Sequence, residues 1–176
     1  MNTTQTNTNE PARHPFEIAG LGVAPYRVIG FDTCQYQACP GAPIQPGTSC
    51  DYCGQGIMYV MRIQASDGKK FKVGCDCVMK VGKESKDYPS QRALDVAARK
   101  MKTDIRHARE EAAIAAGFEW LFSAEVFAKI SALPHPYKWQ SDKGLTMADY
   151  ANWMKKNAGN KGKLDAIKLV KAALAV

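Results

Sequence analysis

Two close pairs of cysteines constrain this sequence more than any other feature. Cys50 and Cys53 lie in SCDYCG, and Cys75 and Cys77 lie in KVGCDCV. A Cys-x2-Cys pair puts two thiolates on one tight turn, and a second pair can complete a tetrahedral shell of four sulfurs around zinc. We therefore expect these four cysteines to hold a structural Zn2+ ion.

The fourth ligand position has several candidates. Cys77 is favoured, because a thiolate at a helix N-terminus is stabilised by the helix dipole and the free backbone donors. Cys75 is the natural fourth ligand, although Cys-x-Cys on one metal is less common than Cys-x2-Cys. If Cys75 points away, Cys34, Cys39 or His107 would have to close the shell.

The cysteines could instead form disulfide bonds or a redox-active dithiol, and disulfide bonds are the first alternative. The N-terminus, MNTTQTNTNEPARHP, lacks the basic start and apolar core of a secretory signal, so we expect a reducing cytoplasm. Clustered cysteines are there more often metal ligands than disulfides. A redox dithiol at Cys50 and Cys53 is the second alternative, but that motif belongs at a strand-to-helix turn, whereas here it precedes a predicted hairpin.

The segments around the cysteines have the composition of a small β module. Alternating and β-branched residues predict strands over 24–31, 57–64 and 69–74, with a turn at 66–68. A helix is then expected to begin near Cys77. A cysteine turn, a hairpin and a helix N-terminus in this order are typical of a treble-clef zinc finger.

The rest of the sequence is predicted to be helical. A long helix is expected over 90–116 with Gly117 as its stop, followed by an apolar helical segment over 118–133. Thr146 begins a further helix with a capping-box pattern, and Gly159 ends it. The last fifteen residues form another amphipathic helix, so these two helices are predicted to make an αα-hairpin.

Together these patterns predict an α+β protein. We expect a disordered polar tail over 1–23, a treble-clef-like zinc-binding β module over 24–82 and a helical region over 89–176. The two ordered parts should pack together, because the zinc module is too small to hold a core by itself. No apolar run approaches eighteen residues, so we expect no membrane span.

The charge distribution points to an anionic partner. The net charge is +7, and residues 1–49 contribute only two basic against three acidic side chains. Five basic residues of the predicted long helix fall on one arc away from its apolar stripe: Arg92, Arg99, Lys102, Arg106 and Arg109. The predicted hairpin adds Lys69, Lys70 and Lys72. A basic excess of this kind favours polyanions such as nucleic acids.

Aromatic side chains could add base stacking to such a surface. The candidates are Tyr52, Tyr59, Tyr137, Trp139 and Trp153. Most of them are expected in the core, Trp153 especially, because it follows Tyr150 by three residues on an apolar helix face.

No catalytic motif is present in the sequence. It lacks a Walker A loop, a dinucleotide fingerprint, a Gly-x-Ser-x-Gly elbow and the zinc deaminase signature. The only histidines are His14, His107 and His135, and none has a nucleophile or carboxylate at the spacing of a known catalytic motif. A catalytic zinc needs an open coordination position, which four thiolates would fill. We therefore expect a protein that is not an enzyme.

Two runs of the sequence resemble known proteins. PGTSCDYCGQGIMYVMRI and DGKKFKVGCDCV resemble the zinc-ribbon or treble-clef segment of small uncharacterised proteins of bacteriophages and mobile elements. The resemblance covers residues 25–80, and more loosely 134–170, where LTMADYANWMKKNAGNKGKL is similar. It implies metal binding and a bacterial or infected-cell cytoplasm. Similar sequences can carry serine at the position of Cys75, which leaves the fourth ligand open.

These observations favour a zinc-stabilised nucleic-acid-binding protein that contacts phosphates through its basic residues. The alternative is a protein-interaction module that binds and modulates a host protein. That alternative predicts an exposed apolar patch formed by Phe118, Trp120, Phe122 and Phe127. A metal-dependent enzyme is the third hypothesis, and the sequence gives no indication of the oligomeric state.

Overall fold

The computed structural model describes residues 13–85 and 89–175. The chain divides into two compact units, Met1–Thr103 and Asp104–Val176. The strands lie in the N-terminal unit and the C-terminal unit is helical, so the protein is α+β, as predicted. The boundary falls inside helix α3 (Pro89–Leu121), so the first part of this helix belongs with the β module.

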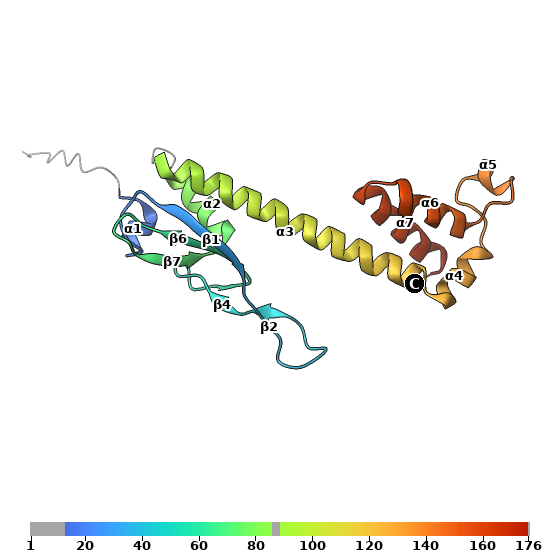
Figure 1. Ribbon diagram of the computed structural model, residues 1–176, viewed down its shortest axis with the longest axis horizontal. Coiled ribbons are helices and arrows are strands. Elements are labelled where there is room, and N and C mark those ends of the chain that lie inside the picture. Colours follow the sequence, from blue (N-terminus) through green and yellow to red (C-terminus); the bar gives the residue numbers. More distant parts are fainter. Residues whose placement is uncertain (1–12, 86–88, 176) are drawn as a thin grey trace, which may run out of the picture. The chain divides into compact units, whose positions relative to one another are not determined.

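A three-stranded antiparallel sheet forms the centre of the N-terminal unit (Figure 1). Its strand order is β1–β6–β7, with β1 at Arg27–Thr33, β6 at Tyr59–Gln64 and β7 at Lys70–Val73. Met61 and Ile63 of β6 are fully buried. The three strands are those that the alternating pattern predicts, with β1 beginning and ending slightly later.

Two short hairpins lie in the segment between β1 and β6. Strand β2 (Gln35–Tyr36) pairs with β3 (Gln45–Pro46), and β4 (Thr48–Ser49) pairs with β5 (Gly56–Ile57). The β2–β3 hairpin projects from the unit (Figure 1). This segment is rich in proline and glycine, and two-residue ladders are too short to show an alternating pattern in the sequence.

Helices α1 (Pro15–Ile18) and α2 (Cys75–Glu84) complete the N-terminal unit with the first part of α3. Gly82 of α2 faces Asp95 of α3, and a Cβ atom at Gly82 would clash with the Asp95 carboxylate. The two helices therefore approach each other closely at this point.

The prediction of a disordered tail over residues 1–23 is wrong for the last residues of that range. Residues 1–12 lie outside the described residues, but His14 and Phe16 are fully buried and α1 lies beside the sheet. The Phe16 ring packs edge-on against the rings of Tyr26, Tyr52 and Phe71. The first residues are polar, so their composition gives no sign that the core of the β module begins before residue 24.

Four helices follow the end of α3 in the C-terminal unit (Figure 1). They are α4 (Ala124–Ser131), α5 (Lys138–Ser141), α6 (Met147–Asn157) and α7 (Asn160–Ala173). The short helix α5 is not predicted by the sequence. No helix in the described parts of the chain is long and apolar enough to span a bilayer.

Gly117 does not stop the long helix, contrary to the prediction. Helix α3 continues to Leu121, and the predicted apolar segment is divided between α3 and α4, with Ser123 as the N-cap of α4. A Cβ atom at Gly117 would clash with Cδ1 of Ile167 and lie 3.1 Å from its Cγ1 and Cγ2 atoms. Gly117 is therefore a packing glycine that lets α7 approach α3.

The two helices of the predicted αα-hairpin, α6 and α7, are both present and contact each other. The Thr146 side chain accepts a hydrogen bond from the Asp149 backbone, and the Asp149 carboxylate accepts one from the Thr146 backbone, which completes a capping box. Helix α6 ends at Asn157, and Gly159 is the N-cap of α7 rather than only the end of α6.

Candidate metal centre

A tight turn between β4 and β5 carries the first two cysteines. The Cys50 amide donates to the Gln55 carbonyl at 2.8 Å, and the Gly54 amide donates to the Cys50 carbonyl at 2.8 Å. Gly54 has φ of 73°, a left-handed conformation that costs glycine little. The sequence CDYCG therefore folds back on itself and brings Cys50 and Cys53 to the same side of the turn.

This turn is fastened to strand β7. The Asp51 amide donates to the Lys72 carbonyl at 2.8 Å, and the Lys72 amide donates to Oδ2 of Asp51 at 2.7 Å. The Tyr52 ring packs edge-on against Phe16, with 5.3 Å between ring centroids. Strand β7 leads directly into α2, so these contacts position the turn against the start of that helix.

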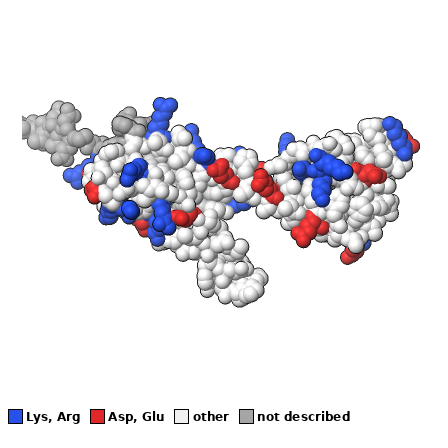
Figure 2. Space-filling view, viewed as in Figure 1, with Lys and Arg blue, Asp and Glu red and all other residues white. Residues whose placement is uncertain are grey.

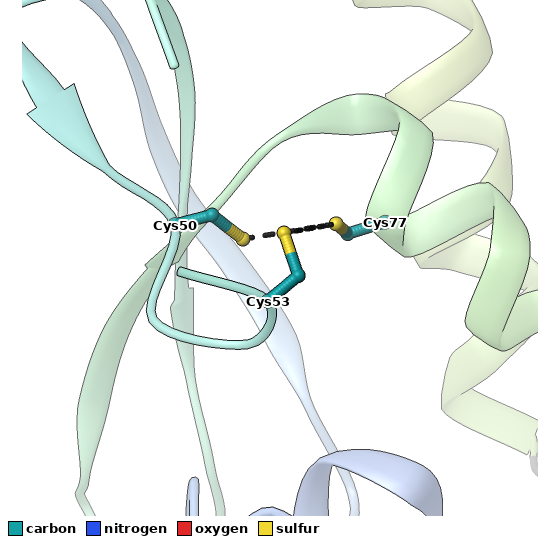
Figure 3. Close-up of side chains that lie close together, drawn as sticks. All are labelled: Cys50, Cys53 and Cys77. Atoms are coloured by element: carbon teal, nitrogen blue, oxygen red, sulfur yellow. Dashed lines mark hydrogen bonds between the residues drawn. The ribbon is translucent and has the colours of Figure 1, made fainter. Parts of the chain in front are cut away.

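Cys77 reaches the turn from α2. It is the third residue of a helix whose N-cap is Gly74. Its Sγ atom lies 3.7 Å from Sγ of Cys50 and donates to Sγ of Cys53 at 3.3 Å (Figure 3). All three sulfurs lie within 4.8 Å of one another. The structure thus brings together three of the four predicted ligands.

The sulfur separations fit metal ligands rather than a disulfide. In a tetrahedral shell with Zn–S bonds of about 2.3 Å, neighbouring sulfurs are about 3.8 Å apart, whereas a disulfide requires about 2.05 Å. All six cysteines are free thiols. The three sulfurs could therefore hold a metal ion with little rearrangement.

The protonation of the cluster is uneven. The backbone N–H of Gln55, and then the thiol of Cys77, lower the pKa of Cys53 by donating to its sulfur. Burial raises the pKa of Cys77, and its hydrogen bond to Cys53 raises it further. Cys77 therefore holds its proton more tightly than an ordinary thiol, whereas Cys53 holds its proton less tightly. Because the thiolate is the ligand form, a bound cation would displace the proton of Cys77.

Cys75 does not join the cluster. The sequence predicts a helix beginning near Cys77, but α2 begins at Cys75. Two residues along a helix are turned by about 200°, so Cys75 and Cys77 leave α2 in nearly opposite directions. Cys75 is half-buried, and this burial, followed by the charge of Asp76, raises its pKa.

Within the part of the chain that the structure describes, the cluster contains none of the other candidate ligands. Cys34 follows β1, and its amide donates to the Met58 carbonyl at 2.7 Å. Cys39 is exposed. His107 is exposed on α3, where Nδ1 lies 3.7 Å from Oε2 of Glu110.

The basic residues of the predicted arc are all exposed on α3: Arg92, Arg99, Lys102, Arg106 and Arg109. Lys102 Nζ lies 2.9 Å from Oδ1 of Asp76, and Arg106 Nε lies 3.9 Å from Oε1 of Glu110. Figure 2 shows Lys and Arg side chains spread over the visible face, with acidic side chains among them. The arc is therefore accessible, and part of its charge is already paired.

The hairpin lysines differ in their surroundings. Lys69 and Lys70 are both exposed, and the Lys69 ammonium contacts the Gly20 carbonyl. Lys72 is half-buried, and its Nζ donates to Oγ1 of Thr48 at 2.9 Å. Lys72 therefore helps to hold β4 and its cysteine turn.

Two predictions about aromatic residues are wrong. Phe118 is buried, and Trp120, Phe122 and Phe127 are partly buried against the core of the C-terminal unit, so they do not form an exposed patch. Trp153 is 59% exposed rather than part of the core. Helical periodicity places a residue on a face, but it does not say which neighbouring element covers that face.

The sequence gives little indication of the role of His14. This residue caps α1, with Nδ1 accepting from the Phe16 amide, and Nε2 lies 2.9 Å from Oε1 of Gln91. The one local signal is Pro15, because proline is favoured in the first position of a helix.

Comparison with known proteins gives no match to a family model, to a curated sequence or to a solved structure.

Proposed function

We propose that Cys50, Cys53 and Cys77 hold a structural zinc ion. Thiolates are soft ligands that select zinc among the common divalent metals, and sulfur separations of 3.3 and 3.7 Å suit its tetrahedral shell. Bound zinc would supply a cross-link between the cysteine turn and the start of α2. The order of cysteine turn, β6–β7 hairpin and α2 supports a treble-clef arrangement.

The fourth ligand is proposed to be Cys75. Its sulfur would turn toward the ion if the first turn of α2 unwound by two residues, to the start that the sequence predicts near Cys77. The Val78 amide donates to the Gly74 carbonyl at 3.2 Å, and this bond of the first turn would be lost in the change. The alternative is a ligand from outside the chain.

We further propose that the protein binds nucleic acid and is not an enzyme. The observation that carries this proposal is that α3 exposes every basic residue of the predicted arc. Residues 1–103 carry thirteen basic and nine acidic side chains, an excess suited to phosphates. Arg92 and Arg99 make no ion pair within the described chain, so both are available to a ligand.

The salt dependence of binding tests this proposal. Full-length protein would be titrated into labelled single-stranded and duplex oligonucleotides between 50 and 300 mM salt, with fluorescence anisotropy as the readout. Each phosphate contact contributes roughly 0.7 (single strand) to 0.9 (duplex) to the slope of log K against log salt. Replacing Arg92 and Arg99 with alanine should lower that slope by about 1.4 to 1.8.

The matched control is Lys129→Ala. Lys129 is exposed on α4 and pairs with Glu125 at 2.7 Å, outside the predicted arc. Its replacement should leave the slope unchanged. Binding that is absent at low salt, or that does not respond to salt, would reject the proposal.

A further inference from the structure

A cavity of about 510 Å³ lies within the C-terminal unit. Its walls include the rings of His135, Tyr137, Trp139, Tyr150 and Trp153. The volume lies within the range of about 300–1,000 Å³ that is typical of ligand pockets. The cavity is remote in sequence from the cysteine cluster and from Arg92 and Arg99.

Backbone contacts close the chain around this cavity. The His135 amide donates to the Leu145 carbonyl at 3.2 Å, and Pro134 forms an isolated β-bridge with Thr146. Thr146 is also the N-cap of α6, which supplies Tyr150 and Trp153. The loop that carries Tyr137 and α5 is thus tied to the start of α6, so the aromatic walls are held in place without a ligand.

The exposure of these rings is unusual. Tyr137 is 54% exposed, and Trp139 and Trp153 are each 59% exposed, whereas Tyr150 is buried. Tyr150 packs edge-on against Tyr137, with 6.0 Å between ring centroids, and against His135 at 5.5 Å. A single exposed aromatic residue needs no explanation, but three around one cavity indicate a binding site.

One cation lies beside an aromatic wall of the cavity. Lys143 Nζ lies 5.0 Å from the centroid of the Trp139 ring. Among the residues that line the cavity, Asp149 is the one carboxylate, and none is a lysine or arginine. Oδ2 of Asp149 is occupied by the backbone and hydroxyl of Thr146. Aromatic walls can also hold organic cations, but the Lys143 ammonium beside Trp139 opposes that use.

A nucleotide combines the features that this cavity matches. Its base offers a flat π face to Trp139 or Trp153, and its phosphate offers a negative charge to Lys143. The side-chain amide of Gln140 also lines the cavity and carries both a donor and an acceptor for the edge of a base. In a duplex the faces of each base are covered by its neighbours, so only an unpaired base could enter.

We propose that this cavity binds an unpaired base of a single-stranded nucleic acid. The base stacks on Trp139 and Trp153, and Lys143, whose ammonium lies near the Trp139 ring, contacts an adjacent phosphate. The site extends the proposed function to the C-terminal unit and does not depend on Arg92 and Arg99.

Tryptophan fluorescence of the full-length protein tests this inference. A Trp120→Phe background leaves Trp139 and Trp153 as the only reporters. A twelve-nucleotide single strand should quench their emission, and a duplex of the same sequence should not. Trp139→Ala and Trp153→Ala should each weaken single-strand binding, measured by anisotropy, by roughly 5- to 150-fold and leave duplex binding within about twofold.

The control variant is Tyr36→Ala, which removes an aromatic ring that is 57% exposed on β2 in the other unit. It should leave quenching and affinity unchanged. Because Trp139 and Trp153 are mostly exposed, their alanine variants should keep the thermal midpoint of the natural chain, and Trp→Phe variants should retain part of the binding.

Three results would overturn the inference. They are no quenching by a single strand, equal quenching by the duplex, and unchanged single-strand affinity in both tryptophan variants. Quenching by a mononucleotide at the same concentration as the oligonucleotide would also contradict it, because the cavity would then bind free nucleotides. If the Arg92 and Arg99 variant keeps its salt slope while the tryptophan variants lose binding, the proposed α3 surface fails and this site stands.

Discussion

Nε2 of His14 lies 2.9 Å from Oε1 of Gln91, in a buried hydrogen bond between residues 77 positions apart in the sequence. Nδ1 of the same ring accepts from the Phe16 amide at 3.2 Å, so the proton is on Nε2. Both ring nitrogens are thus satisfied only in the neutral imidazole. This arrangement ties the start of the chain to α3 within the N-terminal unit.

Protonation of His14 should therefore destabilise the fold. Burial lowers the pKa of His14 below the usual 6.5, outweighing the opposing effects of Gln91 and Glu17. Below about pH 6.5 the histidine of the unfolded chain becomes protonated, whereas His14 of the folded chain stays neutral until a lower pH. The free energy of unfolding therefore falls as the pH falls. The stabilisation is fully present above about pH 6.5. Urea unfolding at pH 7.5 and pH 5.5 would measure the loss.

A His14→Gln variant should lose this part of the pH dependence, although it will be less stable at both pH values. The control is His107→Gln, which removes an exposed histidine of α3 and leaves His14 in place. A His14→Gln profile parallel to that of the natural chain would show that His14 is not the group responsible.

The metal content of serine variants should identify the ligands. Cys50→Ser, Cys53→Ser and Cys77→Ser should each lose stoichiometric zinc and lower the thermal midpoint, because metal affinity is part of the folding free energy. Elemental analysis of gel-filtered protein is the measurement. Cys39→Ser is the control and should keep its zinc, since Cys39 is exposed and outside the cluster.

Cys75→Ser decides the fourth position. Loss of zinc would mean that Cys75 turns toward the ion when metal binds, as proposed. Full zinc content would mean that a ligand from outside the chain completes the shell. The absence of zinc from the natural chain itself, under reducing conditions, would remove the metal centre altogether.

The features that could be predicted from the sequence are those set by local spacing. Cys50 and Cys53 lie on a turn because the two intervening residues and Gly54 require one, and Thr146 begins α6 because its capping partner Asp149 is three residues away. The strands of the central sheet follow from the alternation of apolar residues. In each case the residues that decide the structure are neighbours in the chain.

The features that were missed depend on distant partners. The role of Gly117 depends on Ile167, and the burial of His14 depends on Gln91. The position of Cys75 depends on where α2 begins: because the helix already includes Cys75, its side chain leaves the helix about 200° around the axis from that of Cys77. Trp153 is exposed because no described element covers that part of α6.

The capping box of α6 should contribute measurably to stability. Thr146→Ala removes the hydroxyl that accepts from the Asp149 amide, and should lower the free energy of unfolding by about 1 kcal/mol. The matched control is Ser123→Ala, because Ser123 is the N-cap of α4 but makes no side-chain capping bond. Urea unfolding of both variants is the test, and equal losses would contradict the special role of Thr146.

Replacing Gly117 with alanine should lower the free energy of unfolding, whereas the same replacement usually raises it in helices. In an open helix position, Gly→Ala stabilises by about 1 kcal/mol. At Gly117 the added methyl group would meet the Ile167 side chain, so Gly117→Ala should destabilise by about 1–3 kcal/mol. The control is Ala116→Gly, at the neighbouring exposed position, which should cost about 1 kcal/mol through helix propensity alone. Denaturant unfolding measures both, and a Gly117→Ala variant more stable than the natural chain would mean that α7 does not approach α3 at this residue.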